Sequence, residues 1–351
     1  MSVPATAARP VLSVRRLTID HHVAGPWPWS HAGLLRAVDD VHFDLHAGEA
    51  LGIVGESGCG KSTLARALVG LQDANSGGMV LDGKDLSHLD DLHWRPLRRD
   101  IQMVFQDAVA SLDPRMTIEQ SVEEPLRWLC PELDAAARAA RVAELLTRVG
   151  LGELGGRYPH ELTGGQCQRA GIARALAVKP RVLICDEPVS ALDTVTQSQV
   201  LELLAELQRE QNLALILISH DLAVVQQMCR RVLVMYLGRV MEQATAEELF
   251  ARPRHPYTRA LLASAPGAEP GKHPLPLEGE LPNPLDPPSG CVFRTRCPMA
   301  DDLCARETPH LRKVGEGAYA ACHFVQDPSD TGGESMLREG TVSKRRPAIR
   351  P

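Results

Sequence analysis

The stretch Gly55-Glu-Ser-Gly-Cys-Gly-Lys-Ser62 decides the fold of this 351-residue chain. It matches the phosphate-loop pattern G-x-x-x-x-G-K-[ST], and it follows an apolar run (50–55) and opens a helical run (63–71), the context in which that pattern binds phosphate. The glycines let successive backbone N–H groups point inward, and the helix N-terminus adds partial positive charge. The pattern predicts a nucleoside triphosphate site, with Lys61 on the β and γ phosphates and Ser62 on Mg²⁺. Its expected binding residues are Gly55, Glu56, Ser57, Gly58, Cys59, Gly60, Lys61, Ser62 and Thr63.

A second segment, Arg181-Val-Leu-Ile-Cys-Asp-Glu-Pro188, ends an apolar strand with two acids. Acids at the carboxyl edge of a parallel sheet lie where α/β folds bind their ligands. We expect Asp186 to orient the Mg²⁺ shell and Glu187 to act as the general base that polarises the attacking water. A surface Asp-Glu-Pro that only caps the next helix is the alternative; beside a phosphate loop we favour the catalytic interpretation.

Apolar strands that alternate with helical patterns predict an α/β fold with a largely parallel sheet. Apolar residues recur at i, i+3, i+4 and i+7 over 142–149 and over 200–207, which indicates two amphipathic helices. An Asp-Gly turn within 79–86 predicts a small antiparallel piece. The expected strands are residues 50–55, 101–106, 181–187, 213–219 and 231–242.

The composition excludes several classes of protein. Lys and Arg number 38 against 44 Asp and Glu, and aromatic residues make up 4%, so neither charge nor stacking surface favours nucleic-acid binding. No apolar run reaches the length of about 18 residues that a membrane span needs, and the first ten residues lack a signal-peptide pattern. The nine cysteines are an odd number and several lie inside apolar runs, which favours a reducing cytoplasm over a disulfide scaffold.

Proline content marks the main boundary of the chain. Twelve of the 26 prolines fall between Pro253 and Pro309, where periodic patterning is weak. After residue 325 the chain is polar and without pattern, which is typical of a disordered tail. We therefore expect an N-terminal tail (1–10), a nucleotide-binding domain (11–250), a Pro/Cys-rich C-terminal extension (251–325) and a disordered tail (326–351).

Four further motifs accompany the phosphate loop in a fixed order, and together they resemble the ATP-binding-cassette (ABC) ATPases. They are Gln106 at the end of an expected strand, Leu162-Thr-Gly-Gly-Gln166, Ala191-Leu-Asp193, and His220 after another strand. Singly, each is more often an exposed side chain, a turn or a helix cap. The resemblance implies a RecA-like core, a small antiparallel β subdomain and a helical subdomain at about 107–177.

The resemblance also assigns roles. It implies that Gln106 contacts Mg²⁺ and the attacking water, and that His220 contacts the γ-phosphate and the catalytic glutamate. The signature loop would cover the ATP of a partner ATPase, and Asp193 of the D-loop would lie at the interface. The residues of that signature loop are Thr163 (in place of the usual Ser), Gly164, Gly165 and Gln166.

The aromatic residue that stacks on adenine in this family has no single equivalent. Trp27, Trp29 and His31 are the nearest candidates upstream of the phosphate loop, and Leu35 is the aliphatic alternative.

Segments downstream resemble one branch of the family, the oligopeptide/dipeptide permeases. They include Arg157-Tyr-Pro-His-Glu-Leu162, His255-Pro-Tyr-Thr-Arg-Ala-Leu261 and Gly290-Cys-Val-Phe-Arg-Thr-Arg-Cys-Pro298. The branch implies an ATP-hydrolysing subunit of a bacterial oligopeptide importer at the cytoplasmic face of the inner membrane. Its partners would be a second, non-identical ATPase, two transmembrane permease subunits and an extracytoplasmic peptide-binding protein. Alternative cargoes are dipeptides, murein peptides, glutathione and nickel; a soluble non-transport ABC ATPase is a remote alternative.

Four cysteines gather in the extension: Cys291, Cys297, Cys304 and Cys322. Their spacing lacks the paired C-x₂₋₄-C of structural zinc sites. Four thiolates also suit a [4Fe–4S] cluster, and the resemblance to the permease branch favours it. Zinc and free buried thiols are the alternatives.

Overall fold

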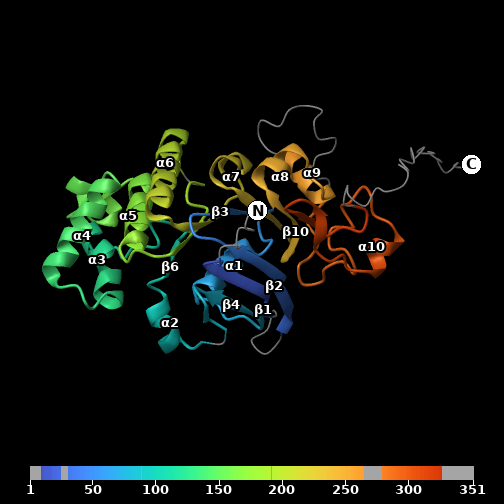
Figure 1. Ribbon diagram of the computed structural model, residues 1–351, viewed down its shortest axis with the longest axis horizontal. Coiled ribbons are helices and arrows are strands. Elements are labelled where there is room, and N and C mark those ends of the chain that lie inside the picture. Colours follow the sequence, from blue (N-terminus) through green and yellow to red (C-terminus); the bar gives the residue numbers. More distant parts are fainter. Residues whose placement is uncertain (1–8, 25–30, 88, 191, 265–278, 326–351) are drawn as a thin grey trace, which may run out of the picture.

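The computed structural model describes residues 9–24, 31–87, 89–190, 192–264 and 279–325. Its largest element is an eight-stranded sheet, in which the five neighbouring strands β9, β3, β8, β7 and β6 run parallel and the β10, β12 and β11 strands extend it antiparallel (Figure 1). The expectation of a largely parallel α/β sheet is therefore confirmed. The strands, in spatial order, are β11 (Arg312–Gly315), β12 (Ala318–Ala320), β10 (Arg239–Thr245), β9 (Arg231–Tyr236), β3 (Ala50–Val54), β8 (Ala214–Ile218), β7 (Val182–Asp186) and β6 (Ile101–Val104).

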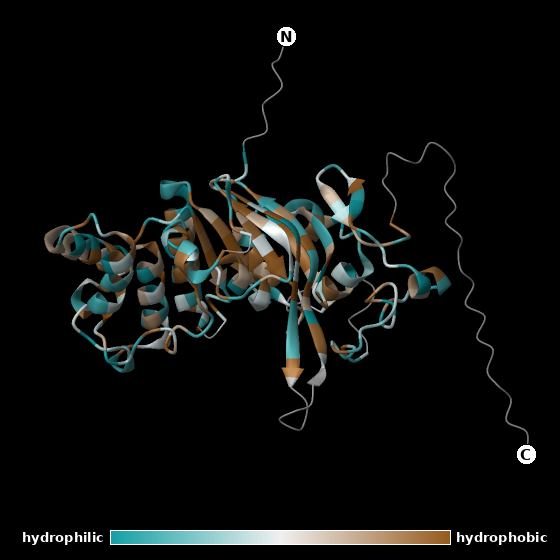
Figure 2. Cartoon of the chain, turned by 90° about the horizontal axis from the view of Figure 1, so that it is seen from below, coloured by the Kyte–Doolittle hydropathy of each residue, from teal (hydrophilic) through white to brown (hydrophobic). Residues whose placement is uncertain are grey.

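The central strands are buried on both faces, which explains their unbroken apolar sequences. In β8, Leu215 and Leu217 face one hydrophobic cluster while Ile216 and Ile218 face the other. Figure 2 shows these strands as a brown layer between more polar outer surfaces. The helices α5 (Gly164–Leu176), α6 (Thr194–Gln211), α7 (Leu222–Met228), α8 (Ala246–Ala251) and α9 (Pro256–Ala263) pack in the first cluster, and α1 (Lys61–Leu68) in the second.

A separate four-stranded antiparallel sheet packs over α1, in the order β2-β1-β4-β5. The Asp82-Gly83 turn joins its last two strands with positive φ at both residues, as the Asp-Gly signal predicts. The elements are β1 (Leu12–Ala24), β2 (His31–Leu45), β4 (Ser76–Leu81) and β5 (Lys84–Asp85), followed by α2 (Asp91–Leu97).

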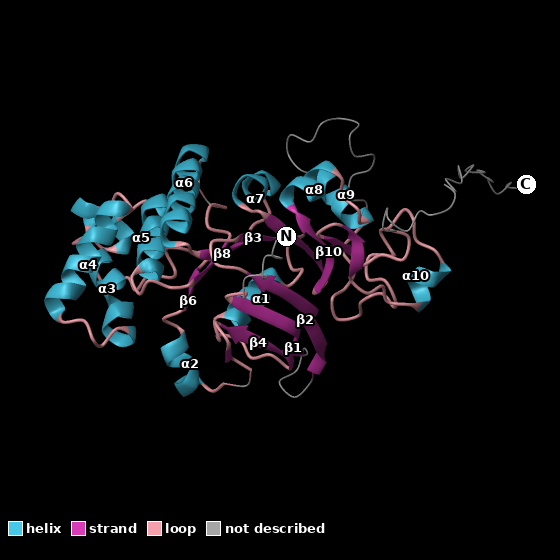
Figure 3. Ribbon diagram, in the orientation of Figure 1, coloured by secondary structure: helices cyan, strands magenta, loops and turns pink. Residues whose placement is uncertain are grey.

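A helical layer forms one end of the molecule (Figure 3). It contains α3 (Ile118–Leu129), α4 (Ala135–Arg148), two short 3₁₀ turns (Gly152–Leu154 and Pro159–Glu161) and α5. Two of the expected helical patterns belong to α4 and α6. No helix in the described residues is long and apolar enough to cross a bilayer.

The run 231–242, expected as one strand, is two. It reverses at Leu237 and Gly238, both with positive φ, and β10 returns antiparallel to β9. The expectation of a single strand was wrong because both halves are equally apolar and a tight turn leaves hydrophobicity unchanged.

The C-terminal extension packs onto the core. Its β12 pairs with β10, and Tyr257 and Phe293 lie, 0% and 1% exposed, in the same hydrophobic cluster as the central strands. The short α10 (Asp302–Arg306) lies at the far end. Residues 1–8 of the expected N-terminal tail (1–10) and the whole expected C-terminal tail (326–351) lie outside the described residues.

Candidate active site

The phosphate loop connects β3 to α1 through a space too small for side chains. A Cβ on Gly60 would lie 2.0 Å from the carbonyl oxygen of Ala37, and one on Gly55 would lie 2.2 Å from that of Met235. Gly60 also has φ of 105° where it caps α1. The two glycines therefore let the loop pass between β2 and β9 and wrap around the helix N-terminus.

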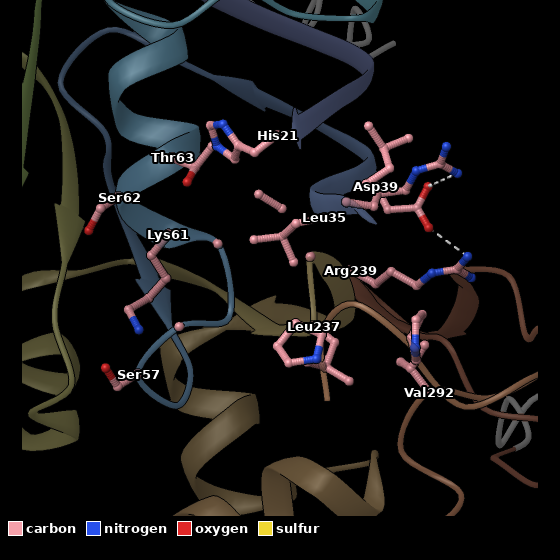
Figure 4. Close-up of a pocket in the computed structure, with 18 of the residues that line it drawn as sticks. His21, Leu35, Asp39, Ser57, Lys61, Ser62, Thr63, Leu237, Arg239 and Val292 are labelled. Atoms are coloured by element: carbon pink, nitrogen blue, oxygen red, sulfur yellow. Dashed lines mark ion pairs between the residues drawn. The ribbon is translucent and has the colours of Figure 1, made fainter. Parts of the chain in front are cut away.

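Lys61 lies inside this loop. Its side chain is buried, and its Nζ donates to the carbonyl oxygens of Gly55 (2.8 Å) and Glu56 (3.0 Å). Figure 4 shows the ammonium group beside Ser57. Burial raises the pKa of the neighbouring Cys59 thiol, so this cysteine stays protonated. The loop thus holds one fixed positive charge at the helix N-terminus, as a phosphate-binding loop requires.

The loop is joined to the second acidic segment through Ser62. Its Oγ donates to Oδ1 of Asp186 at 3.2 Å, and Asp186 is almost fully buried at the end of β7. Burial, with the adjacent Glu187 charge, raises the pKa of Asp186. A hydroxyl and a carboxylate this close are suitable oxygen ligands for Mg²⁺.

Three expected catalytic side chains converge at the carboxyl edge of the parallel sheet. Gln106, after β6, donates from Nε2 to Oε2 of Glu187 at 2.9 Å. The Nδ1 of His220, after β8, lies 3.3 Å from Oε1 of the same carboxylate. Glu187 has φ of 49°, a left-handed conformation that costs a non-glycine residue on the order of 1 kcal/mol. The fold therefore holds this carboxylate in a strained, oriented position.

The signature loop lies apart from that group. Thr163 and Gln166 form a reciprocal capping box at the start of α5, with Thr163 and Gly164 exposed. Gly165 is buried against α6, so closely that an added Cβ would lie 2.4 Å from Cγ2 of Thr196. Asp193 caps α6 through the N–H groups of its first turn. None of these residues lines the cleft beside the chain's own phosphate loop, within the described residues.

A cleft of about 820 Å³ opens beside the phosphate loop. Gln106 and Glu187 line one part of it, and Leu35, Leu237 and Val292 face the loop across it (Figure 4). Of the four candidates for contact with the base, Leu35 lies in this cleft. Trp27 and Trp29 lie outside the described residues, as does the side chain of His31.

The C-terminal extension contributes a wall that sequence motifs missed. Pro287, Ser289 and Thr308 line the cleft more than 220 positions after the phosphate loop. Asp39 stands at the same wall and pairs with Arg239 at 2.6 Å and Arg36 at 3.8 Å. Prolines and small residues that follow no motif do not indicate a ligand-binding site in a sequence. The high proline content of this segment was the one feature that set it apart from the cassette.

The four extension cysteines lie near one another but form no metal site. Cys291, Cys304 and Cys322 are buried and Cys297 partly so, all in the free thiol form. Burial, with a smaller contribution from the other three thiols, raises the pKa of Cys297 to about 11. Throughout the described ranges no three His, Cys, Asp or Glu side chains are close enough together to hold a metal ion. The structure therefore gives no support to the expected iron–sulfur cluster or to zinc.

Comparison with known proteins identifies the family to which this chain belongs. The family model "ABC transporter" matches residues 38–190, and "Oligopeptide/dipeptide transporter, C-terminal region" matches 241–304. The chain is 53% identical to the oligopeptide transport ATP-binding protein OppF of Salmonella typhimurium, over 86% of this chain and 91% of that protein. A probable peptide ABC transporter ATP-binding protein of Sinorhizobium fredii is 49% identical over 89% of each chain. The chain therefore belongs to the ATP-binding proteins of ABC transporters and is an ABC-type ATPase.

Solved structures agree on the fold. A dimeric ATP-binding cassette in a post-hydrolysis state with ADP and Pi superposes with a TM-score of 0.61 at 29% identity, over 67% of this chain and 98% of that one. CbiO1 from Clostridium perfringens gives 0.59 at 31% identity, over 69% and 91%. The expected ABC nucleotide-binding fold is confirmed.

Proposed function

We propose that this chain is the ATP-hydrolysing subunit of a bacterial ABC importer of oligopeptides. The observation that carries the proposal is the 53% identity to oligopeptide transport ATP-binding proteins, which extends beyond the cassette into the C-terminal segment 241–304. The same C-terminal family includes dipeptide transporters, so peptides as a class are supported more strongly than their length.

The phosphate loop and the acidic segment would hold Mg-ATP. Lys61 supplies the positive charge for the β and γ phosphates, and the backbone N–H groups of the loop surround them. Ser62, Asp186 and Gln106 are the Mg²⁺ ligands that we propose, supported by the Ser62–Asp186 contact of 3.2 Å. The ion would neutralise phosphate charge during transfer.

Glu187 would be the general base. Its carboxylate is oriented by Gln106 and lies beside His220 at the edge of the cleft. A carboxylate held in this way accepts a proton from water as the water attacks. His220 would contact the γ-phosphate side of the site.

The signature loop would act on a partner's ATP. It exposes the N-terminus of α5 at Thr163 and Gly164, apart from the chain's own cleft, and helix N-termini favour anions. Asp193 of the D-loop would lie at the same interface. We infer a second, non-identical ATPase subunit there.

The remaining partners are proposed from the resemblance to the peptide-permease branch. Two transmembrane permease subunits would dock on residues 107–116, where Val109 is exposed, and on the helical layer that follows, where Trp128 is exposed. An extracytoplasmic peptide-binding protein would deliver cargo. The chain would then reside at the cytoplasmic face of the inner membrane, without contact to nucleic acid.

Affinity purification from membranes in mild detergent, followed by mass spectrometry, tests this assembly. We expect two membrane subunits and a second ATPase, and ATP turnover by the complex that rises when peptide-loaded binding protein is added. Recovery with ribosomes, DNA or soluble partners alone would overturn the import proposal and leave the ATPase assignment standing.

An iron–sulfur cluster at the four extension cysteines stays a prediction from resemblance. Metal analysis of anaerobically purified chain decides it: about four iron atoms per chain with visible charge-transfer absorption would support a [4Fe–4S] cluster. One zinc per chain would support the alternative, and a metal-free chain would leave free thiols.

A further inference from the structure

Glu56, inside the phosphate loop, is held at three groups: its carbonyl, its backbone N–H and its carboxylate. Its carbonyl oxygen accepts a hydrogen bond from Lys61. Its backbone N–H donates to Oη of Tyr257 at 3.0 Å, and its carboxylate pairs with both terminal nitrogens of Arg296 at 2.6 and 3.1 Å. Tyr257 and Arg296 both belong to the C-terminal extension, so two of the three contacts come from residues at least 200 positions away.

Arg296 is placed rigidly. Its side chain is 5% exposed, compared with 26% for Glu56, and its guanidinium lies 5.9 Å from the ring centroid of Tyr236. Its backbone N–H donates to the carbonyl of Phe293, whose ring packs against Tyr236 and Tyr257 at centroid distances of 5.4 and 5.3 Å. A planar guanidinium on a carboxylate in two-point contact is a strong, directional pair.

The Arg296–Glu56 ion pair neutralises a negative charge inside the phosphate loop. A carboxylate in a loop that binds polyphosphate adds negative charge where the ligand is already an anion. The guanidinium neutralises it, and because the pair is mostly shielded from water, removal of the arginine would leave a poorly solvated carboxylate close to the phosphates. The carboxylate would also be free to compete for Lys61, which lies five positions further along and already donates to the Glu56 carbonyl.

We propose that Arg296 is a positioning residue for nucleotide binding: it holds and neutralises Glu56, and through it the C-terminal extension sets the affinity of the phosphate loop for ATP. The proposal requires ATP binding by this chain and does not depend on peptide import.

Titration of full-length chain with Mg-ATP by calorimetry tests the proposal without any transport partner. We expect Arg296→Gln to raise the dissociation constant of ATP about tenfold or more, because like charges then face each other across a short, partly desolvated distance. Arg296→Lys, which keeps the charge without the two-point contact, should fall in between. The double variant Glu56→Gln/Arg296→Gln should return to within about threefold of the parent, since it removes both charges.

Arg306→Gln is the matched control. Arg306 is an exposed arginine of the same extension that donates to the Asp302 carbonyl of its own helix, and its loss should leave ATP affinity unchanged. A folded Arg296→Gln chain with parental affinity would overturn the proposal, as would a double variant no better than the single one.

Thermal melting separates this effect from a loss of folding. If Arg296→Gln does not fold, a folded double variant with near-parental affinity supports the proposal, because the uncompensated carboxylate is then the cause. A double variant that also fails to fold would show that the arginine serves the extension alone, which overturns it.

Discussion

At the scale of single residues, the contacts of Glu187, the general base that we propose, are separate from those that organise the phosphate loop. The carboxylate contacts Gln106 and lies beside His220, whereas the phosphate loop is organised by Lys61 and its own carbonyl contacts. A change confined to Glu187 therefore leaves the loop intact.

Glu187→Gln should keep ATP affinity and lose turnover. The amide keeps the size of the side chain but accepts no proton, and general-base catalysis is typically worth about 10²- to 10⁴-fold in rate. We expect kcat of the assembled ATPase to fall by that order while the dissociation constant of Mg-ATP changes little. Glu206→Gln, on the exposed face of α6, is the control. Parental turnover in Glu187→Gln would remove this residue from the mechanism.

At the scale of elements, the start of α5 contains two glycines with different surroundings. A methyl group on Gly165 would lie 2.4 Å from Cγ2 of Thr196, whose Oγ1 is bound to Asp193 at 2.7 Å and so holds the rotamer in place. A methyl group on Gly164 would meet no atom within 4 Å. A Gly→Ala substitution therefore crowds the contact between α5 and α6 at position 165 but enters open space at position 164.

Gly165→Ala should destabilise the chain by about 1–3 kcal/mol, because the added methyl overpacks the contact between α5 and α6. Gly164→Ala should leave the melting temperature unchanged or slightly higher, since alanine favours the helix. If the exposed end of α5 faces a partner's ATP, Gly164→Ala should nevertheless lower turnover of the assembled ATPase.

The two variants are measured side by side by thermal melting of the chain and ATP turnover of the complex. A stable Gly165→Ala would mean that α5 and α6 separate easily. Full turnover with Gly164→Ala would argue against a signature loop at the interface.

At the scale of the whole molecule, His255 ties the extension to the core. Its Nδ1 accepts from the N–H of Tyr257, so Nε2 carries the hydrogen that is donated to the Ala321 carbonyl at 3.2 Å. The fully buried Glu242 of β10 accepts from the N–H groups of Arg254 and His255 at 2.8 Å each. Burial, with the nearby Arg259 charge, lowers the pKa of His255 to about 3.

The lowered pKa of His255 predicts that the free energy of unfolding falls as the solution becomes acidic. Unfolding restores His255 to an ordinary pKa of 6.5, so between pH 6.5 and about pH 3 the unfolded chain binds a proton that the folded chain does not. Stability from the neutral imidazole is complete above pH 6.5 and declines as the pH falls, with a slope that approaches about 1.4 kcal/mol per pH unit.

Urea unfolding between about pH 7.5 and pH 5, where most carboxylates stay ionised, measures that slope. His255→Asn keeps an acceptor at the start of α9 but does not titrate, so its stability should depend less on pH than that of the parent. Equal slopes in the two chains would show that His255 does not remain neutral when folded.

The local motifs were readable because each is contiguous and carries its own chemistry. The phosphate loop, the acidic strand end and the positions of Gln106 and His220 depend on strand ends, which apolar runs reveal. The hairpin at Leu237-Gly238 was missed because two apolar strands in succession read as one. Four cysteines in the extension, together with the family resemblance, predicted an iron–sulfur cluster, and among the described residues no group of His, Cys, Asp or Glu side chains is arranged to hold a metal ion.

By itself, the sequence determined that this protein is an α/β ATPase of the cassette type, because each of its motifs is contiguous and their order along the chain, from the phosphate loop through Gln106 to His220, resembles that family. Only the tertiary structure decided how its C-terminal extension is used. The pairing of Arg296 with Glu56 and the cleft wall at Ser289 join segments more than 200 positions apart. Such contacts depend on where β10 and β12 place the extension against the sheet, and that arises from packing of the whole core, which local sequence patterns do not encode.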